Sequence, residues 1–416
     1  MTFLKQTISP PGLKHTYSMR VEQYRGVCAL LVLLAHGSGD EGMLVNNFRW
    51  PNMIHYFNAG LLSVMVFFCI SGYVIGLNYD RNKIKIKEYL KKRAIRLFPI
   101  YLFALILCVL VAGFPQWHVL LGNALFLQTD QTYFGISIPI FVNYPAWSLN
   151  FEVVYYLAFI GIFFWRPAVW KILLIMAAIT ILSLFMGDHL VLLSDYVNGF
   201  YFWMMGLMIA WKIFDTTDSE DIAVPFFSIL FLHMSLHHLN VGEIAMHLLG
   251  IHTLNNTSWL FNIPFSLMVM CTLTGRSNSF LKFNKILCYC LPAMVFLYLG
   301  INHRLTEDTR WVMCLIFWIL SLIFYFEKRV SGFVLSKLTG LGKISYALYL
   351  IHVPVAKLIK KTIFIQNQGL EVAVKYSLWI VITFGLAYLL ERRLQPAIKK
   401  YFSAKQVDKH LFQTPA

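Results

Sequence analysis

The chain has 416 residues, of which 58% are hydrophobic and 13% are charged, whereas about 25% of the residues in soluble globular proteins carry charge. This composition excludes a soluble domain, and the 16% of aromatic residues exclude a disordered or collagen-like chain. The net charge of +15 is concentrated at the ends of apolar runs, so we expect no nucleic-acid partner. The seven cysteines lie within or beside apolar runs, and we expect neither disulfides nor a bound metal.

Apolar runs of about 17 to 23 residues recur from Val27 to Leu390, and a helix of that length crosses a bilayer. The sequence therefore predicts an all-α, polytopic membrane bundle with about ten to twelve transmembrane helices. Residues 118–128 are also apolar but too few to span, so we expect a re-entrant or interfacial helix there. The predicted apolar segments, in chain order, are residues 24–38, 57–77, 97–114, 147–165, 168–186, 197–214, 222–239, 258–275, 286–301, 311–326, 344–365 and 372–390.

The distribution of Lys and Arg predicts the orientation, because these residues collect in cytoplasmic loops. Eight of them fall within residues 81–96, whereas residues 115–146 contain none. We expect a multi-pass protein of the inner (plasma) membrane with both termini in the cytoplasm. Its parts would be a cytoplasmic segment (1–20), a membrane domain (21–391) and a basic cytoplasmic tail (392–416). Lys357, Lys360 and Lys361 are exceptions to this scheme.

Ionisable residues inside a span are costly and are therefore functional candidates. Arg25 and His36 are eleven residues apart in the first span, so they share one helical face about 16 Å apart along the axis. This orientation puts Arg25 near the cytoplasmic face and His36 in the outer half. The alternative is an arginine that snorkels to the interface and a histidine that hydrogen-bonds a neighbouring helix.

Glu152 is the second candidate, with Ser148 and Tyr156 four residues away on either side and on the same face. Trp147 would mark the outer interface, which puts Glu152 in the same half of the bilayer as His36. A carboxylate beside an imidazole fixes its tautomer and stabilises the imidazolium, as a general base requires. Alternatively, Glu152 is a protonated structural hydrogen-bonder.

Arg93 and Arg96 are three residues apart at the start of the third span and share a face, with Tyr101 following. Such a pair at the inner interface suits a lipid phosphate or the phosphates of a nucleotide. His352, in a later span, supports the site only in combination with the other residues.

Together these motifs resemble the integral-membrane acyltransferase family 3, which includes O-acetylases of bacterial lipopolysaccharide, peptidoglycan and other envelope glycans. The resemblance covers roughly residues 20–391, although residues 168–332 match none of its motifs. It rests on Arg25 and His36 with ten residues between them, on VFFCISGYVIG around Ser71, on Arg93, Arg96, Pro99 and Tyr101, on Trp147, Ser148, Leu149 and Glu152, and on LGKISYALYLIH with Tyr346, Tyr349 and His352.

The resemblance implies transfer of an acyl group, usually acetyl, from cytoplasmic acyl-coenzyme A (acyl-CoA) to a hydroxyl of a glycan or lipid-linked sugar. Acyl-CoA would be a substrate, with no tightly bound cofactor, and the oligomeric state stays open. In this interpretation His36 is the base or a transient acyl carrier, and Glu152 orients it. A secondary transporter with a buried Arg, His and Glu site is the alternative, but the sequence has no internal repeats. The expected donor-binding residues are Arg25, Arg93, Arg96 and Tyr101, and the supporting residues are Ser71, Ser148, Tyr156, Tyr346 and His352.

Overall fold

The structure, a computed structural model, describes residues 11–39, 42–79, 84–129, 138–186, 190–213, 217–218, 224–242, 244 and 256–402. Within these ranges the secondary structure is helical, apart from two short antiparallel strands, β1 (Thr217–Asp218) and β2 (Arg276–Ser277). The predicted all-α class is thus confirmed for the part of the chain that is described. Residues 1–10 and 403–416, which belong to the predicted terminal segments, lie outside it.

Each predicted apolar segment contains a helix, and residues 147–165 match one helix exactly in extent. The short apolar stretch at 118–128 corresponds to α5. Two helices, α2 and α14, were not predicted. The elements are α1 (Pro11–Gly39), α2 (Asn52–His55), α3 (Gly60–Asn78), α4 (Ile86–Ala112), α5 (Trp117–Ala124), η1 (Tyr144–Ala146), α6 (Trp147–Trp165), α7 (Val169–Met186), α8 (Val191–Ala210), α9 (Phe226–His238), η4 (Asn256–Asn262), α11 (Ile263–Thr274), α12 (Ser279–Ile301), α13 (Thr309–Phe326), α14 (Lys328–Gly342), α15 (Ser345–Thr362), α16 (Gln368–Leu389) and the π-helical turn η5 (Leu390–Leu394).

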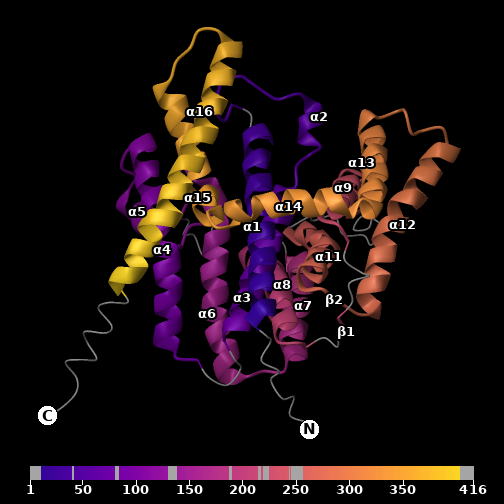
Figure 1. Ribbon diagram of the computed structural model, residues 1–416, viewed down its shortest axis with the longest axis horizontal. Helices are drawn as coiled ribbons and strands as arrows, with labels where there is room; N and C mark the ends of the chain where they lie inside the picture. Colours follow the sequence, from indigo (N-terminus) through magenta and orange to yellow (C-terminus); the bar gives the residue numbers. More distant parts are fainter. Residues whose placement is uncertain are drawn as a thin grey trace.

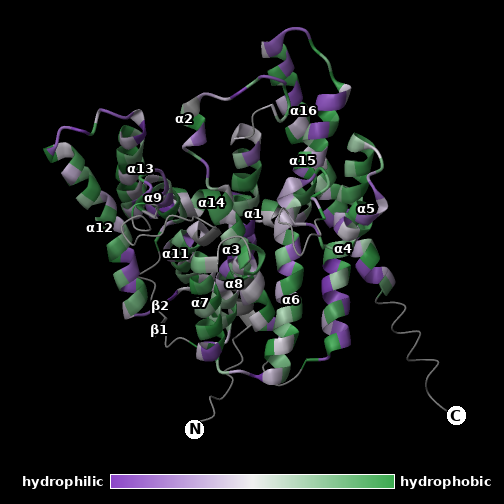
Figure 2. Ribbon diagram, turned by 180° about the vertical axis from the view of Figure 1, so that it is seen from behind, coloured by the Kyte–Doolittle hydropathy of each residue, from purple (hydrophilic) through white to green (hydrophobic). Residues whose placement is uncertain are grey.

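Six helical stretches within the described residues are long and apolar enough to cross a membrane. Large apolar side chains such as Phe164, Phe185 and Phe326 are exposed on the helix surfaces, as contact with lipid requires, and Figure 2 shows hydrophobic residues along most of α6 and α7. These observations support a multi-pass membrane protein, and the count of ten to twelve spans stays a prediction. The six stretches are Met53–Asn78, Ile86–Ala112, Tyr144–Trp165, Ser279–Ile301, Thr309–Phe326 and Gln368–Phe402.

Helix α1 occupies the centre of the bundle, and α14 runs across it (Figure 1). The two backbones approach closely because both helices have a glycine at the crossing. A Cβ at Gly26 would lie 2.4 Å from the carbonyl oxygen of Leu338, and one at Gly342 would lie 1.8 Å from that of Glu22. The crossing fixes the level of Arg25 relative to the start of α15, since only two residues separate Gly342 from that helix.

Glycines also allow α3 and α8 to pack backbone against backbone. A Cβ at Gly72 would lie 2.0 Å from the carbonyl oxygen of Trp203, and a Cβ at Gly206 would lie 1.8 Å from that of Cys69. Phe202 and Trp203 are fully buried beside this contact. The tight packing turns the opposite face of α3, which carries Ser71, toward α4 and α6.

Proline-containing α4 is tied to the last helix. Pro99 has no N–H, so the carbonyl of Ile95, four residues earlier, has no donor within the helix. The side-chain amide of Gln395 donates to this carbonyl at 2.6 Å. Gln395 follows the π-helical turn, and the helix then continues to Phe402. The bond holds the last helix beside Arg96.

Candidate active site

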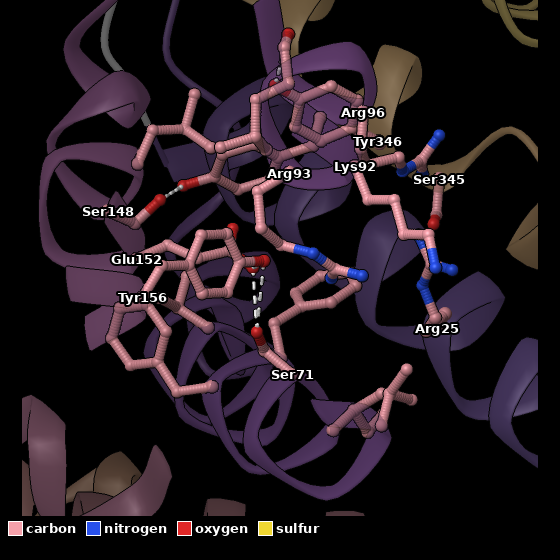
Figure 3. A pocket seen from close by; sticks show the side chains of 18 of the residues that line it. Arg25, Ser71, Lys92, Arg93, Arg96, Ser148, Glu152, Tyr156, Ser345 and Tyr346 are labelled. Carbon is pink, nitrogen blue, oxygen red and sulfur yellow. Dashed lines mark hydrogen bonds between the residues drawn. The ribbon is translucent and has the colours of Figure 1, made fainter. Parts of the chain in front are cut away.

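A cavity of about 540 Å³ lies among α1, α3, α4, α6 and α15, within the range of small-molecule sites. Its described lining has five cationic side chains and a single carboxylate, Glu152, so it suits an anionic ligand. Figure 3 shows Ser71, Glu152 and Tyr156 on one side of the cavity, Arg25 on the other, and Arg93 between them. The polar lining residues are Arg25, Ser71, Lys92, Arg93, Arg96, Ser148, Glu152, Tyr156, Ser345, Tyr346, Tyr349 and Lys399.

Glu152 gathers two hydroxyl groups at the cavity wall. Its Oε1 accepts a hydrogen bond of 2.8 Å from Ser71 Oγ and another from the hydroxyl of Tyr156. The two hydroxyl oxygens are also 3.3 Å apart. Tyr156 lies one helical turn after Glu152 in α6, as the sequence predicted from their spacing, whereas Ser71 comes from α3. The carboxylate therefore fixes the position of both hydroxyls.

Arg93 is held by aromatic faces. Its guanidinium lies 5.5 Å from the ring centroid of Tyr156 and 5.9 Å from that of Tyr89, distances at which cation–π attraction acts. Tyr89 in turn donates to the backbone carbonyl of Tyr156. These contacts aim the charge of Arg93 into the cavity without an ion pair to a described carboxylate, so it stays available to a ligand phosphate.

Arg96, by contrast, is paired within the protein. Its Nη1 lies 2.6 Å from Oε2 of Glu391, which is almost fully buried, and its guanidinium covers the ring of Tyr346 at 4.9 Å. Glu391 lies in the π-helical turn, one turn before Gln395. Arg25 forms a longer pair, 3.3 Å, with Glu22. Both arginines line the cavity as predicted, but each shares its charge with a carboxylate.

His36 lies outside this cavity, against a second histidine. Its ring stacks on that of His352, with the centroids 5.4 Å apart and the planes 27° apart, and meets the edge of Tyr144 at 5.0 Å. His352 is fully buried, and its Nδ1 is 2.7 Å from the backbone oxygen of Tyr349. Since a carbonyl only accepts, Nδ1 carries the proton and Nε2 of neutral His352 is an acceptor. The structure therefore pairs the two histidines that the sequence had placed in separate spans.

Tyr349 separates the histidine pair from the cavity. Its hydroxyl shares a hydrogen bond of 2.7 Å with Ser148 Oγ and also donates to the carbonyl of Pro145. Both Tyr349 and Ser148 line the cavity. Glu152 lies one turn, about 5.4 Å, further along α6 than Ser148. The expectation that Glu152 orients His36 is therefore corrected, because Glu152 lines the cavity whereas His36 lies outside it, against Tyr144 and His352.

Tyr101 was expected to bind the donor, but it lies away from the lining. Its hydroxyl donates to the carbonyl of Asn123 at 2.8 Å, and its ring stacks on Phe126 at 4.3 Å between centroids. Tyr101 thus anchors α5 to α4. Conversely, Lys92 and Lys399 line the cavity although neither was singled out. Lys92 belongs to the basic run that pointed to Arg93, whereas only the path of the last helix brings Lys399 to the site.

Comparison with known proteins places the chain in a family. Residues 20–392 match the acyltransferase domain family. A stretch of 127 residues, 28% of the chain, is 33% identical to the exopolysaccharide production protein ExoZ of Rhizobium meliloti (strain 1021), and this match spans 38% of that protein. No solved structure matches the chain. Because the family match covers residues 20–392 of the 416, the chain belongs to the acyltransferase domain family, acyltransferase family 3.

Proposed function

We propose that this protein is a membrane O-acyltransferase that moves an acyl group, acetyl in the simplest case, from cytoplasmic acyl-CoA to a hydroxyl of a carbohydrate acceptor. The observation that carries the proposal is the cationic cavity, which ends at Tyr349 beside the His36–His352 pair. Membership of the acyltransferase family supports the reaction, and the likeness to an exopolysaccharide production protein supports an envelope polysaccharide, or its lipid-linked precursor, as the acceptor.

The cavity has the two kinds of lining that acyl-CoA needs. The phosphates of the nucleotide end would bind Arg25, Arg93 and the lysines Lys92 and Lys399, because guanidinium and ammonium groups form charge-assisted hydrogen bonds to phosphate. The uncharged pantetheine arm would lie along the apolar lining, which includes Phe67 and Phe68 of α3. The thioester would then reach the Ser148–Tyr349 end of the cavity.

At that end His36 would act as a general base. It would take the proton of the acceptor hydroxyl while the hydroxyl oxygen attacks the thioester carbonyl, the carbon–sulfur bond breaks, and the imidazolium returns its proton to the departing thiolate. His352, stacked on His36, would hold the ring in place. The Ser148–Tyr349 hydrogen bond would have to open for the thioester to meet the acceptor.

We also propose that both termini are cytoplasmic, in a multi-pass protein of the inner membrane. The basic run at 81–96 precedes or begins α4, and its Lys92, Arg93 and Arg96 border the cavity. The first turns of α1 and the end of the last helix lie toward the same edge of the molecule in Figure 1. This orientation would open the donor cavity to the cytoplasm, where acyl-CoA is made.

The test uses the purified protein in lipid nanodiscs with radiolabelled acetyl-CoA and a membrane extract as the source of acceptor. We expect free CoA to be released and the label to appear in the glycan fraction. Both should be lost in His36→Ala. His118→Ala, an exposed histidine of α5, is the matched control. Label retained on the protein would instead indicate an acyl-histidine intermediate. Full activity of correctly inserted His36→Ala would refute this mechanism, and solute uptake without CoA release would indicate a transporter.

A further inference from the structure

Three lysines gather where α15 ends and α16 begins. Lys357 and Lys360 lie in the last turns of α15, and Lys375 lies in the second turn of α16, with only 2% of its surface exposed. Lys357 and Lys375 are close enough to Lys360 for their positive charges to repel it. None of the three lines the donor cavity. They therefore form a second cationic cluster, which we name the hairpin lysines.

Among the residues that the structure describes, the hairpin lysines have more positive charge than the neighbouring carboxylates neutralise. Lys375 pairs with Glu371 at 2.5 Å. Lys357 and Lys360, however, donate to backbone carbonyls, those of Val142 (3.1 Å) and Gly42, and in the part of the chain that the structure describes no carboxylate lies within 4 Å of either ammonium. Partly buried cations without a counter-ion are costly, and a bound anion removes that cost.

The cluster adjoins the proposed base. The ammonium of Lys357 lies 5.7 Å from the ring centroid of Tyr144, and the same ring meets His36 at 5.0 Å. Beyond His36, the carbonyl of Gly37 accepts hydrogen bonds from Trp50 Nε1 and from the hydroxyl of Tyr376. These bonds fix the end of α1 that carries His36. A molecule held by the hairpin lysines would thus be one aromatic ring away from the imidazole.

The position of the cluster also concerns the lysines that do not fit the predicted orientation. Lys357 and Lys360 occupy the outer end of their span in the proposed orientation, where lysines are disfavoured. The donor phosphates have their own cations in the cavity on the other side of Tyr349. Neither donor binding nor membrane topology therefore explains the hairpin lysines. Their position and their separation from the donor cavity both point to an anionic ligand on the acceptor side.

We infer that Lys357 and Lys360, with Lys375 beside them, bind an anionic group of the acceptor and so hold its hydroxyl near His36. This inference rests on the proposed function and adds the acceptor's chemistry to it: the acceptor carries a phosphate or a carboxylate. The anion has two possible sources, the diphosphate that links a growing sugar to a polyprenyl lipid and the carboxylate of a uronic acid in the glycan. Lys375 is already paired with Glu371, so it adds positive charge near the anion and does not contact it directly.

The experiment measures binding to the full-length protein in neutral phosphatidylcholine nanodiscs, with polyprenyl diphosphate in one arm and a glucuronate-containing tetrasaccharide in the other. We expect the unsubstituted protein to bind one of these probes, which identifies the source. The double variant Lys357→Gln with Lys360→Gln should bind it at least ten-fold more weakly. Lys361→Gln is the matched control, because Lys361 is exposed and donates to the carbonyl of Val111 at the end of α4 instead.

The charge-keeping double variant Lys357→Arg with Lys360→Arg should retain binding, and it keeps the test decisive if the glutamine variant fails to fold. Binding of neither probe by the unsubstituted protein would overturn the inference, as would equal binding by the glutamine variant. CoA binding is measured on the same samples. Loss of anion binding with intact CoA binding refutes only the acceptor site, whereas absence of CoA binding in the unsubstituted protein refutes the proposed function.

Discussion

The side-chain amide of Asn143 donates a hydrogen bond of 2.9 Å to the backbone carbonyl of Leu350. This is the carbonyl that would accept from residue 354 in an unbroken α-helix, and residue 354 is Pro354, which has no N–H. Helix α15 continues through the proline because Asn143 supplies the missing donor. The bond ties the segment before α6, with Tyr144, to the helix that carries Tyr349 and His352. It therefore fixes the relative position of the cavity wall and the histidine pair.

We predict that Asn143→Ala destabilises the protein, because both Asn143 and Leu350 are buried and an unsatisfied buried carbonyl costs about 1–3 kcal/mol. Adding Pro354→Ala should recover part of the loss, because the new N–H can donate to Leu350 within the helix. Thermal unfolding in detergent micelles measures both variants and the double variant. Additive effects of the two substitutions would contradict this coupling.

Arg93 provides the clearest test of donor binding, because its guanidinium is held by aromatic rings and not by a described carboxylate. Arg93→Gln should raise the KM for acyl-CoA about ten-fold or more, as loss of a charge-assisted hydrogen bond to phosphate is worth about 1.5–3 kcal/mol. Steady-state kinetics in nanodiscs measure this KM. Lys91→Gln serves as the control, since Lys91 contacts Phe402 outside the cavity. Equal KM values for Arg93→Gln and the unsubstituted protein would remove Arg93 from the donor site.

Substitution of Glu152 tests whether its carboxylate does more than accept structural hydrogen bonds. Glu152→Gln keeps the size of the side chain but offers Ser71 and Tyr156 an amide in place of a charged acceptor. We expect kcat to fall about ten-fold, with little change in the KM for acyl-CoA, because Glu152 lies one turn from Ser148 at the acyl end of the cavity and hydrogen bonds to charged groups contribute about 1.5–3 kcal/mol. Ser71→Ala should cause a smaller fall. If Glu152→Gln changed KM alone, the cluster would belong to donor binding.

The helices could be predicted from the sequence because each follows from a local property, the length of an apolar run. Residues 147–165 show this, since they coincide with α6. Helix α14 was missed for the same reason: its residues 328–342 are too polar for a span, and the helix packs against α1 through close contacts at Gly26 and Gly342. Such a contact depends on two distant segments, and one sequence does not show it.

The sequence predicted which residues line the site better than it predicted which residues contact one another. Arg25, Arg93, Arg96 and Glu152 line one cavity, as expected of ionisable groups inside spans. Their partners were not predictable, because Glu391 lies 295 residues further along the chain and meets Arg96 through the path of the last helix, which Gln395 also bonds to the carbonyl of Ile95. The same holds for His352, whose contact with His36 depends on how α15 packs against α1.

Close packing of α3 and α8 should make the fold sensitive to a single added methyl group. A Cβ at Gly206 would lie 1.8 Å from the carbonyl oxygen of Cys69 and 2.8 Å from the amide nitrogen of Tyr73. No side chain can move aside there, because both obstacles are backbone atoms. Gly206→Ala should therefore push the helices apart and destabilise the protein by about 1–3 kcal/mol or more.

The control for Gly206→Ala is Gly385→Ala, because no heavy atom outside its own helix backbone lies within 4 Å of a Cβ at Gly385. Replacing a helical glycine by alanine there should be neutral or stabilising by up to about 1 kcal/mol. Thermal unfolding in micelles compares the two variants, and donor binding reports whether Ser71 keeps its place when α3 shifts. Equal stability of the two variants would mean that α3 and α8 are further apart in the protein than their glycines indicate.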